Sequence, residues 1–144
     1  MTVPAGADLH HIGIVVPSID AALPVYRDLL GLAATEAKVM PDQAVRVLFL
    51  TGGGAQVELL EPLDNESGVA RFLARRGGPT LHHVCFAVDD LAAVLRDLAA
   101  RGVELIDHAP RRGAEGLVAF LHPRAGDGVL IELIDRASIR AHDR

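Results

Sequence analysis

Four side chains have the types and the spacing of a metal site. Two are histidines, His11 in L-H-H-I-G-I-V-V and His83 in L-H-H-V-C-F-A-V. The other two, Glu58 and Glu132, are each a carboxylate in the middle of an otherwise apolar segment. Carboxylates are seldom buried unless they are paired or bind a metal. Imidazole with carboxylate suits a divalent first-row ion such as Co, Mn, Ni or Zn. We therefore predict that the four residues bind one such ion.

The two histidine segments form an internal repeat. Four of their eight positions are identical, and they are offset by 72 residues in a chain of 144. A lone histidine or glutamate on a strand is more often structural, but recurrence at matched places of a duplicated unit favours a shared site. The neighbouring His10 and His82 fall on the opposite strand face and are expected to be structural or exposed. Cys85 shares the face of His83 and is expected to be a small packing residue, with a soft extra metal ligand as the alternative.

Each half of the chain has the pattern βαβββ, which would position these residues. Ser18 begins a predicted helix that ends near Leu30, and Asp89 or Asp90 begins one that ends near Arg101, each followed by a glycine. The first half has predicted strands at 9–16, 35–39, 45–50 and 56–61. The second half has predicted strands at 81–88, 103–107, 117–122 and 129–134. A short helix near 66–75 lies in the connection between the halves.

The pattern predicts an α+β fold in which two βαβββ modules form a curved eight-stranded mixed sheet around the metal site, with the helices on the convex side. The chain is predicted to be one domain, with module one at about 9–62, a connection at 63–80, module two at about 81–135, and a polar tail at 136–144 that frays. Side chains alternate along a strand. The bulky face of each first strand is therefore expected to pack under a helix, and the histidine face to line the site.

Composition excludes several classes of protein. The net charge of −5 lacks the basic stripe of a nucleic-acid-binding protein. No apolar run reaches the ~18–20 residues that cross a bilayer, and the first residues lack a secretory signal pattern. The single cysteine cannot form an internal disulfide, which fits a reducing compartment. We expect a cytoplasmic protein that binds neither nucleic acid nor membrane.

Residues 9–135 resemble the methylmalonyl-CoA epimerases of the glyoxalase/vicinal-oxygen-chelate superfamily. Besides the two histidine segments, the resemblance is carried by V-E-L-L-E-P-L-D-N-E-S-G-V-A-R-F-L and F-L-H-P-R-A-G-D-G-V-L-I-E-L. The resemblance implies paired βαβββ modules around a divalent ion, often Co or Mn, and usually a homodimer. The family's ligand positions fall on His11, His83 and Glu132, and a Gln-or-Glu position falls on Glu58. The implied reaction interconverts the 2R and 2S forms of methylmalonyl-CoA, an acyl-CoA substrate.

That reaction needs an acid/base group on each face of a planar enolate, and a positive charge near its oxygen. Glu132 is the best candidate for one catalytic base. Some bacterial members carry a second catalytic Glu in the third strand. That position is Val47 here, in Q-A-V-R-V, and animal members also have an apolar residue there. The second acid/base group is then Glu58, a bound water or another residue.

Arginines are candidates for binding the anionic parts of such a substrate. Arg124, in the H-P-R segment before the last strand, is predicted to bind the substrate carboxylate, and the alternative is an ordinary surface arginine. Arg111 and Arg112 have the chemistry to meet CoA phosphates, although a solvated loop is the competing interpretation.

Three other functions stay open at this point. The chain is alternatively another enzyme of the superfamily, such as a glyoxalase-type isomerase or lyase, or a non-enzymatic small-molecule-binding module. The segments E-P-L-D-N-E-S and F-L-H-P-R argue against the first, and the four ligand types argue against the second. Two histidines and one carboxylate also suit a non-haem iron oxygenase, but Glu58 as a fourth ligand would occupy a position that oxygen needs.

Overall fold

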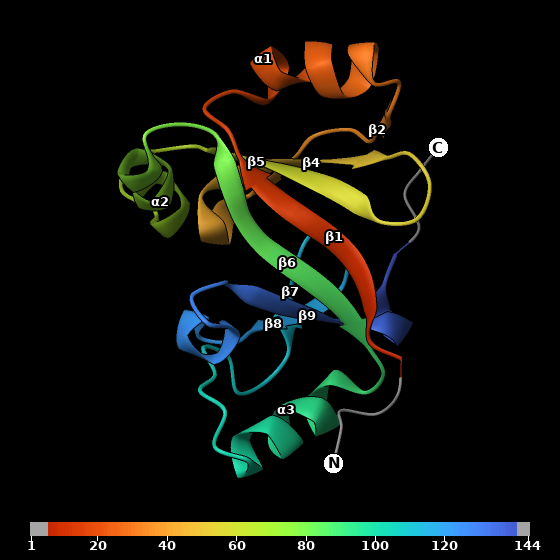
Figure 1. The fold of residues 1–144 in the computed structure, drawn as a ribbon, viewed down its shortest axis with the longest axis vertical. Helices are drawn as coiled ribbons and strands as arrows, with labels where there is room; N and C mark the ends of the chain where they lie inside the picture. Colours follow the sequence, from red (N-terminus) through yellow and green to blue (C-terminus); the bar gives the residue numbers. More distant parts are fainter. Residues whose placement is uncertain (1–5, 141–144) are drawn as a thin grey trace. The chain divides into compact units, whose positions relative to one another are not determined.

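The structure is a computed structural model that describes residues 6–140 (Figure 1). The described chain divides into two compact units. The first unit contains residues 11–82, and the second unit contains residues 6–10 and 83–140. Both boundaries fall inside a histidine pair, between His10 and His11 and between His82 and His83.

The first unit is built on a sheet with the strand order β2-β4-β5-β1. Strand β1 (Asp8–Val15) runs parallel to β5 (Gln56–Pro62), which is antiparallel to β4 (Val45–Thr51). The predicted strand at 35–39 is present only in part: β3 (Lys38–Met40) overlaps its end, a separate short strand β2 (Ala33–Ala34) precedes it, and both pair with β4. Between them the Thr35 hydroxyl accepts a hydrogen bond from the Phe49 N–H at 3.0 Å, which replaces a backbone bond of the ladder.

The helix of the first unit begins and ends where the sequence predicts. Ser18 caps α1 (Ile19–Leu23) by accepting from the Ala21 N–H at 3.2 Å, and the helix continues as a π-helix, Pro24–Leu29. The change to π-helix coincides with Pro24, whose ring and missing N–H disrupt regular α-helical bonding. The buried helix residues Ile19 and Leu23 pack against the sheet, in a core that includes Val16, Leu48, Leu50 and Leu59.

The predicted short helix in the connection is present as α2 (Gly68–Arg76). The Ser67 hydroxyl accepts from the Ala70 N–H at 3.1 Å at its start, and Gly77 ends it with a φ of 75°. Asp64 accepts from the N–H groups of Glu66 and Ser67, and these two bonds hold the pKa of the Asp64 carboxyl below its usual value. The turn before α2 is therefore fixed by side-chain hydrogen bonds.

The second unit repeats the plan with the strand order β6-β9-β8-β7. Strand β6 (Thr80–Val88) runs parallel to β9 (Ile131–Asp135), and β8 (Leu117–Phe120) is antiparallel to β9 and to β7 (Arg111–Arg112). The predicted strand at 103–107 is wrong: this segment makes a single bridge, from Leu105 to Leu121. The Asp107 carboxylate accepts from the Phe120 N–H at 2.8 Å, so a side chain again replaces a ladder bond.

Helix α3 (Leu91–Ala100) covers one face of the second sheet (Figure 1). Asp90 caps it by accepting from the Ala93 N–H at 3.2 Å, and Gly102 follows its end with a φ of 79°. The buried side chains of α3 pack against those of the strands, in a core that includes Leu91, Val94, Leu95, Val88, Ala119 and Leu133. Each helix thus occupies the face of its own sheet opposite the site histidine, His11 in the first unit and His83 in the second.

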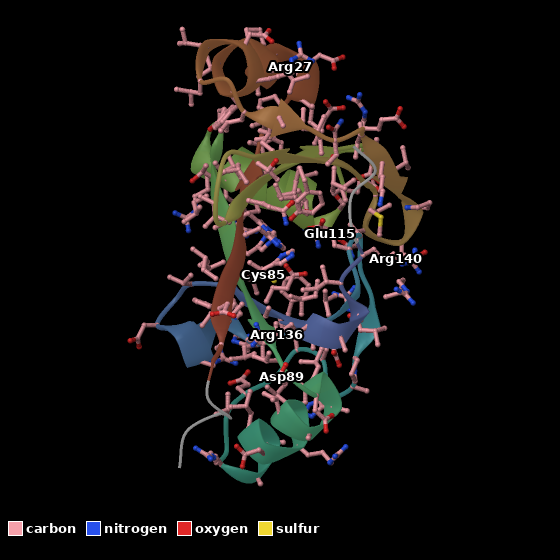
Figure 2. The ribbon with its side chains drawn as sticks, turned by 90° about the vertical axis from the view of Figure 1, so that its right-hand side faces the viewer. Arg27, Cys85, Asp89, Glu115, Arg136 and Arg140 are labelled. Atoms are coloured by element: carbon pink, nitrogen blue, oxygen red, sulfur yellow. The ribbon has the colours of Figure 1, made fainter. Side chains whose placement is uncertain are left out.

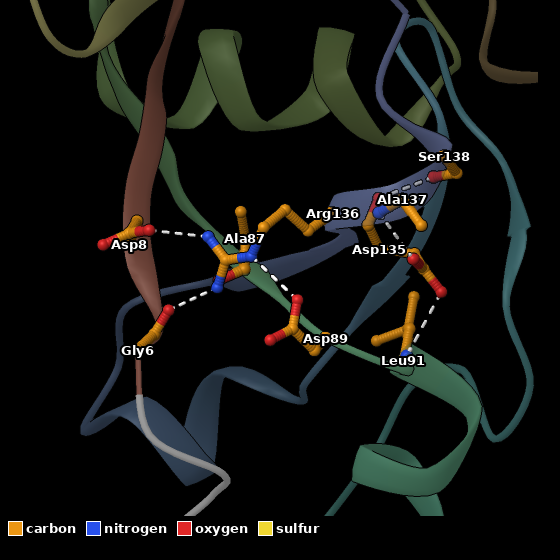
Figure 3. Close-up of polar contacts among 9 residues, drawn as sticks. All are labelled: Gly6, Asp8, Ala87, Asp89, Leu91, Asp135, Arg136, Ala137 and Ser138. Carbon is orange, nitrogen blue, oxygen red and sulfur yellow. Dashed lines mark hydrogen bonds and ion pairs between the residues drawn. The ribbon is translucent and has the colours of Figure 1, made fainter.

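Arg136 ties both ends of the described chain to the second unit (Figure 3). Its guanidinium donates to Asp8 at 2.6 Å, to Asp89 at 2.9 Å, and to the carbonyl oxygens of Gly6 and Ala87. The hydrogen bond with Asp89 is the main cause of the raised pKa of this arginine. The prediction of a fraying tail is therefore wrong for residues 136–140, and residues 141–144 lie outside the described part of the chain.

Candidate active site

The first unit brings His11 and Glu58 together. His11 Nε2 lies 3.4 Å from Glu58 Oε1, and the two residues are only 3% and 7% exposed. Leu59 packs under the helix, so strand alternation turns Glu58 to the opposite face. Phe49 on β4 is directly across from Glu58, and its ring meets the His11 ring edge-on at 5.5 Å. The first unit therefore holds a buried imidazole–carboxylate pair beside an aromatic ring.

The second unit contains the equivalent arrangement. His83 Nε2 lies 3.2 Å from Glu132 Oε1, and the two residues are 2% and 8% exposed. Phe120 is directly across from Glu132, with its ring edge-on to His83 at 6.0 Å. We call each set of histidine, glutamate and phenylalanine a half-site. The sequence reasoning found the histidines and glutamates but missed both phenylalanines. The available signal was that each lies in the strand before the glutamate strand of its own half.

The geometry of each half-site fits a divalent metal ion. Ligand atoms about 2.0–2.2 Å from one ion lie ~3.0 Å apart at a right angle and ~3.4 Å apart at a tetrahedral angle. The observed N···O distances of 3.2 and 3.4 Å fall in this range. A buried carboxylate on an apolar sheet face also needs a compensating positive charge, which an ion would supply. Each half-site offers two such ligands.

Other polar residues near the half-sites have structural contacts. His82 packs edge-on against Phe72 at 4.9 Å, as expected for a structural histidine. His10 is half-buried, with Nε2 3.9 Å from the Glu115 carboxylate. Glu115 is a buried carboxylate that the sequence reasoning missed, since it lies in a loop with no strand pattern. Cys85 packs among Ala87, Val118 and Ile134, as predicted, and both Cys85 and Glu115 are labelled in Figure 2.

The third strand of the first unit offers no second carboxylate. Val47 is buried, and its cross-strand partner is Leu60. It shares a strand face with Phe49, two residues further along β4, and therefore with Glu58. Val47 thus contributes only apolar surface next to the carboxylate of the first half-site.

The candidate arginines have different surroundings. Arg124 donates to both carboxylate oxygens of Glu104, at 3.1 and 2.6 Å, and its side chain is 73% exposed. The hydrogen bond from Arg124 is the main reason that the pKa of Glu104 lies below its usual value. Arg111 instead stacks over the Phe120 ring, with its guanidinium carbon 5.3 Å from the ring centroid. Arg112 follows it on the same short strand and is exposed.

Comparison with known proteins places the chain among related sequences and structures. The family described as "Glyoxalase/Bleomycin resistance protein/Dioxygenase superfamily" matches residues 10–120. The ethylmalonyl-CoA/methylmalonyl-CoA epimerase of Cereibacter sphaeroides is 37% identical over 127 residues, which cover 87% of this chain and 95% of that protein.

Two solved structures extend the comparison to the fold. The methylmalonyl-CoA epimerase of Mycobacterium tuberculosis has a TM-score of 0.85 and 37% identity, covering 94% of this chain and 92% of that one. A methylmalonyl-CoA epimerase in complex with methylmalonyl-CoA and NH4+ has a TM-score of 0.83 and 34% identity. The match covers 94% of this chain and 99% of that one. The likeness confirms the predicted α+β fold class of two βαβββ modules.

No helix within residues 6–140 has the length and apolar character needed to cross a bilayer.

Proposed function

The chain belongs to the methylmalonyl-CoA epimerase family of the glyoxalase superfamily, and we propose that it interconverts (2R)- and (2S)-methylmalonyl-CoA. Its family membership confirms the resemblance carried by the four sequence segments. The observation that carries the proposal is the pair of equivalent half-sites, each with a buried glutamate next to a histidine. Buried carboxylates suit an acyl-CoA epimerisation, because this reaction needs a base that removes a proton from carbon.

The proton in question is bound to C2, between a thioester carbonyl and a carboxylate. Its removal moves negative charge onto the thioester oxygen and leaves C2 planar. Return of a proton to the same face regenerates the substrate, and return to the opposite face gives the epimer. The protein must therefore stabilise the oxygen charge and hold an acid/base group near each face.

We propose that His11, Glu58, His83 and Glu132 together hold one divalent ion, Co, Mn, Ni or Zn. Each half-site supplies two ligands, which is fewer than the three or four protein ligands usual for a resident ion such as zinc. The internal repeat supports pooling of the two half-sites, since it gives matched ligands that are each incomplete alone. When bound, the ion supplies Lewis-acid stabilisation of negative charge on the thioester oxygen.

Glu132 is the proposed base for the C2 proton. Its carboxylate is held next to His83 Nε2 at 3.2 Å, which fixes the orientation of the accepting oxygens. Phe120, across from Glu132, places an apolar ring edge-on to His83 beside the pair. A dry surrounding strengthens the electrostatic interactions of the carboxylate with its partners.

Glu58 is the proposed acid/base group for the other face. It is equivalent to Glu132 in the repeat, and Val47 leaves its strand face without another carboxylate. A bound water is the alternative. If Glu58 exchanges the second proton, Glu58→Gln saturated with metal should slow conversion to the epimer more than it slows C2 proton exchange.

Two further predictions remain part of the proposal. Arg124 already donates to Glu104 from Nε and from one terminal nitrogen, so a two-bond contact between that same edge and the substrate carboxylate would require this pair to open. A cytoplasmic homodimer is proposed on the family resemblance and on the single cysteine of the sequence, which cannot form an internal disulfide and fits a reducing compartment. The molar mass in solution, measured by light scattering, tests the dimer.

Deuterium exchange tests the proposed function directly. Metal-stripped protein is reloaded with Co or Mn and incubated with methylmalonyl-CoA in D2O. We expect deuterium at C2 by mass spectrometry, together with mixing of the two stereoisomers. Glu132→Gln should abolish both. Absence of exchange with fully loaded wild-type protein would overturn the proposal. Turnover of the methylglyoxal–glutathione adduct would instead indicate a glyoxalase, and tight binding without exchange a binding module.

A further inference from the structure

Arg111 lies on the same sheet face as the second half-site. It is across from Val118 in the antiparallel pair of β7 and β8, so the two side chains share a face. Phe120 is two residues beyond Val118, and Glu132 is across from Phe120. The next residue on β7, Arg112, falls on the opposite face by strand alternation. One of two adjacent arginines is therefore turned toward the half-site.

A single aromatic ring separates Arg111 from His83. The Arg111 guanidinium lies over one face of the Phe120 ring at 5.3 Å, and the same ring meets His83 edge-on at 6.0 Å. The stacking contact gives the cation a defined place at the edge of the sheet. The arginine is thus close enough to the half-site to reach a group bonded to the reacting carbon.

Asp107 fixes the Arg111 guanidinium and leaves its outer edge available. Arg111 Nε donates to one Asp107 oxygen at 3.1 Å, and the other oxygen accepts from the Phe120 N–H at 2.8 Å. Within residues 6–140, the interactions of Arg111 are this bond and the contact with Phe120. Its two terminal nitrogens form the fork that binds a carboxylate with two parallel hydrogen bonds. Arg124, in contrast, donates to Glu104 from a terminal nitrogen as well as from Nε, so one arm of its fork is already engaged.

We propose that Arg111 binds the free carboxylate of the substrate. The inference rests on the proposed function and names the residue that recognises the malonyl group. The substrate carboxylate is bonded to C2, whereas the CoA phosphates lie at the far end of the pantetheine arm. A cation one ring away from His83 therefore matches the carboxylate better than the phosphates. Neutralising the carboxylate also eases formation of a second negative charge on the neighbouring thioester oxygen.

Two ligands that differ by this carboxylate test the proposal. Propionyl-CoA has the same thioester and CoA portions as methylmalonyl-CoA but lacks the free carboxylate. Dissociation constants for both are measured by calorimetry on metal-loaded wild type, Arg111→Met, Arg111→Lys and Arg112→Met. Arg112→Met is the matched control, since it removes the adjacent cation on the other strand face.

We expect Arg111→Met to weaken methylmalonyl-CoA binding roughly 10- to 100-fold, the effect of losing a charge-assisted hydrogen-bonding partner. Propionyl-CoA binding should change less than about twofold, and Arg112→Met should leave both ligands within that margin. Arg111→Lys should show an intermediate loss, because lysine keeps the charge but not the fork. Unfolding temperatures confirm that each variant is folded before binding is measured.

Equal weakening of both ligands by Arg111→Met would overturn the proposal in favour of contact with the CoA portion. Unchanged binding of both would also overturn it. Failure of the proposed function looks different: wild-type protein would not exchange the C2 proton, while the difference between the two ligands would persist.

Discussion

The two half-sites predict how much a divalent ion stabilises the protein and which substitution removes that effect. Glu132→Gln is the informative change, because glutamine keeps the size of the side chain and removes its charge. The carboxylate is buried, with Oε1 3.2 Å from His83 Nε2, so a ligand is lost without opening a cavity. The metal-free variant should therefore fold like the metal-free wild type.

The size of the effect follows from binding linkage. An ion present at 100 times its dissociation constant raises the free energy of unfolding by about 2.7 kcal/mol. A chain of 144 residues has an unfolding entropy of about 0.3 kcal/mol/K, so the unfolding temperature should rise by about 9 °C. If loss of one ligand weakens metal binding ~100-fold, the same ion concentration raises the free energy of unfolding by only about 0.4 kcal/mol. The unfolding temperature then rises by roughly 1 °C.

Scanning calorimetry of chelator-treated protein, with and without added Co or Mn, measures this shift. Glu104→Gln is the control, since it removes an exposed carboxylate that pairs with Arg124 and belongs to neither half-site, and it should keep the full shift. A full shift in Glu132→Gln would refute its assignment as a ligand. Glu58→Gln should lose the shift as well, and titration should give one ion per chain. If the wild type binds two ions per chain and each Glu→Gln variant loses only one of them, the two half-sites do not share one ion.

Three further predictions concern the fold. Leu59→Ala, at a fully buried position under the first helix, should lower the free energy of unfolding in urea by about 2–5 kcal/mol, whereas Leu29→Ala, at a 77% exposed side chain, should change it by less than about 0.5 kcal/mol. Gly116→Ala should cost about 1–3 kcal/mol in the same assay, because its Cβ would lie 2.6 Å from the Ser138 hydroxyl and 2.9 Å from the Ser138 carbonyl oxygen. The lowered pKa of Glu104 means that its ionised form contributes stability above its ordinary value of 4.5, and that this contribution is lost as the pH falls through the lower folded-state pKa. The difference in unfolding temperature between wild type and Glu104→Gln should therefore vanish in acid, and a difference that grows in acid would contradict this reasoning.

The internal repeat and strand alternation were enough to predict the local structure of the site. Alternation assigned Glu58 and Glu132 to the face opposite the helices, and capping residues located both helix starts. These features depend on residues close together in sequence. The strand predictions failed at Thr35 and Asp107, because each side chain replaces a backbone hydrogen bond of the sheet. The pattern of apolar residues gives no sign of such a replacement.

Contacts that depend on strand register could not be predicted. Phe49 and Phe120 face the glutamates only because particular residues pair across neighbouring strands. The same holds for Arg111, which reaches Phe120 through the pairing of a two-residue strand that has no sequence signal. The position of Arg136 among Asp8 and Asp89 likewise required the folded chain.

The ion pair between Arg136 and Asp8, at the start of β1, has a consequence for folding kinetics. Its bond to Asp8 joins residues 128 positions apart, and closing so long a loop has a large entropic cost. Helices and hairpins form from local contacts, so this bond should be made after the transition state for folding. Weakening it should then leave the folding rate nearly unchanged and speed unfolding. The lifetime of the native state is therefore set in part by an ion pair at the two ends of the described chain.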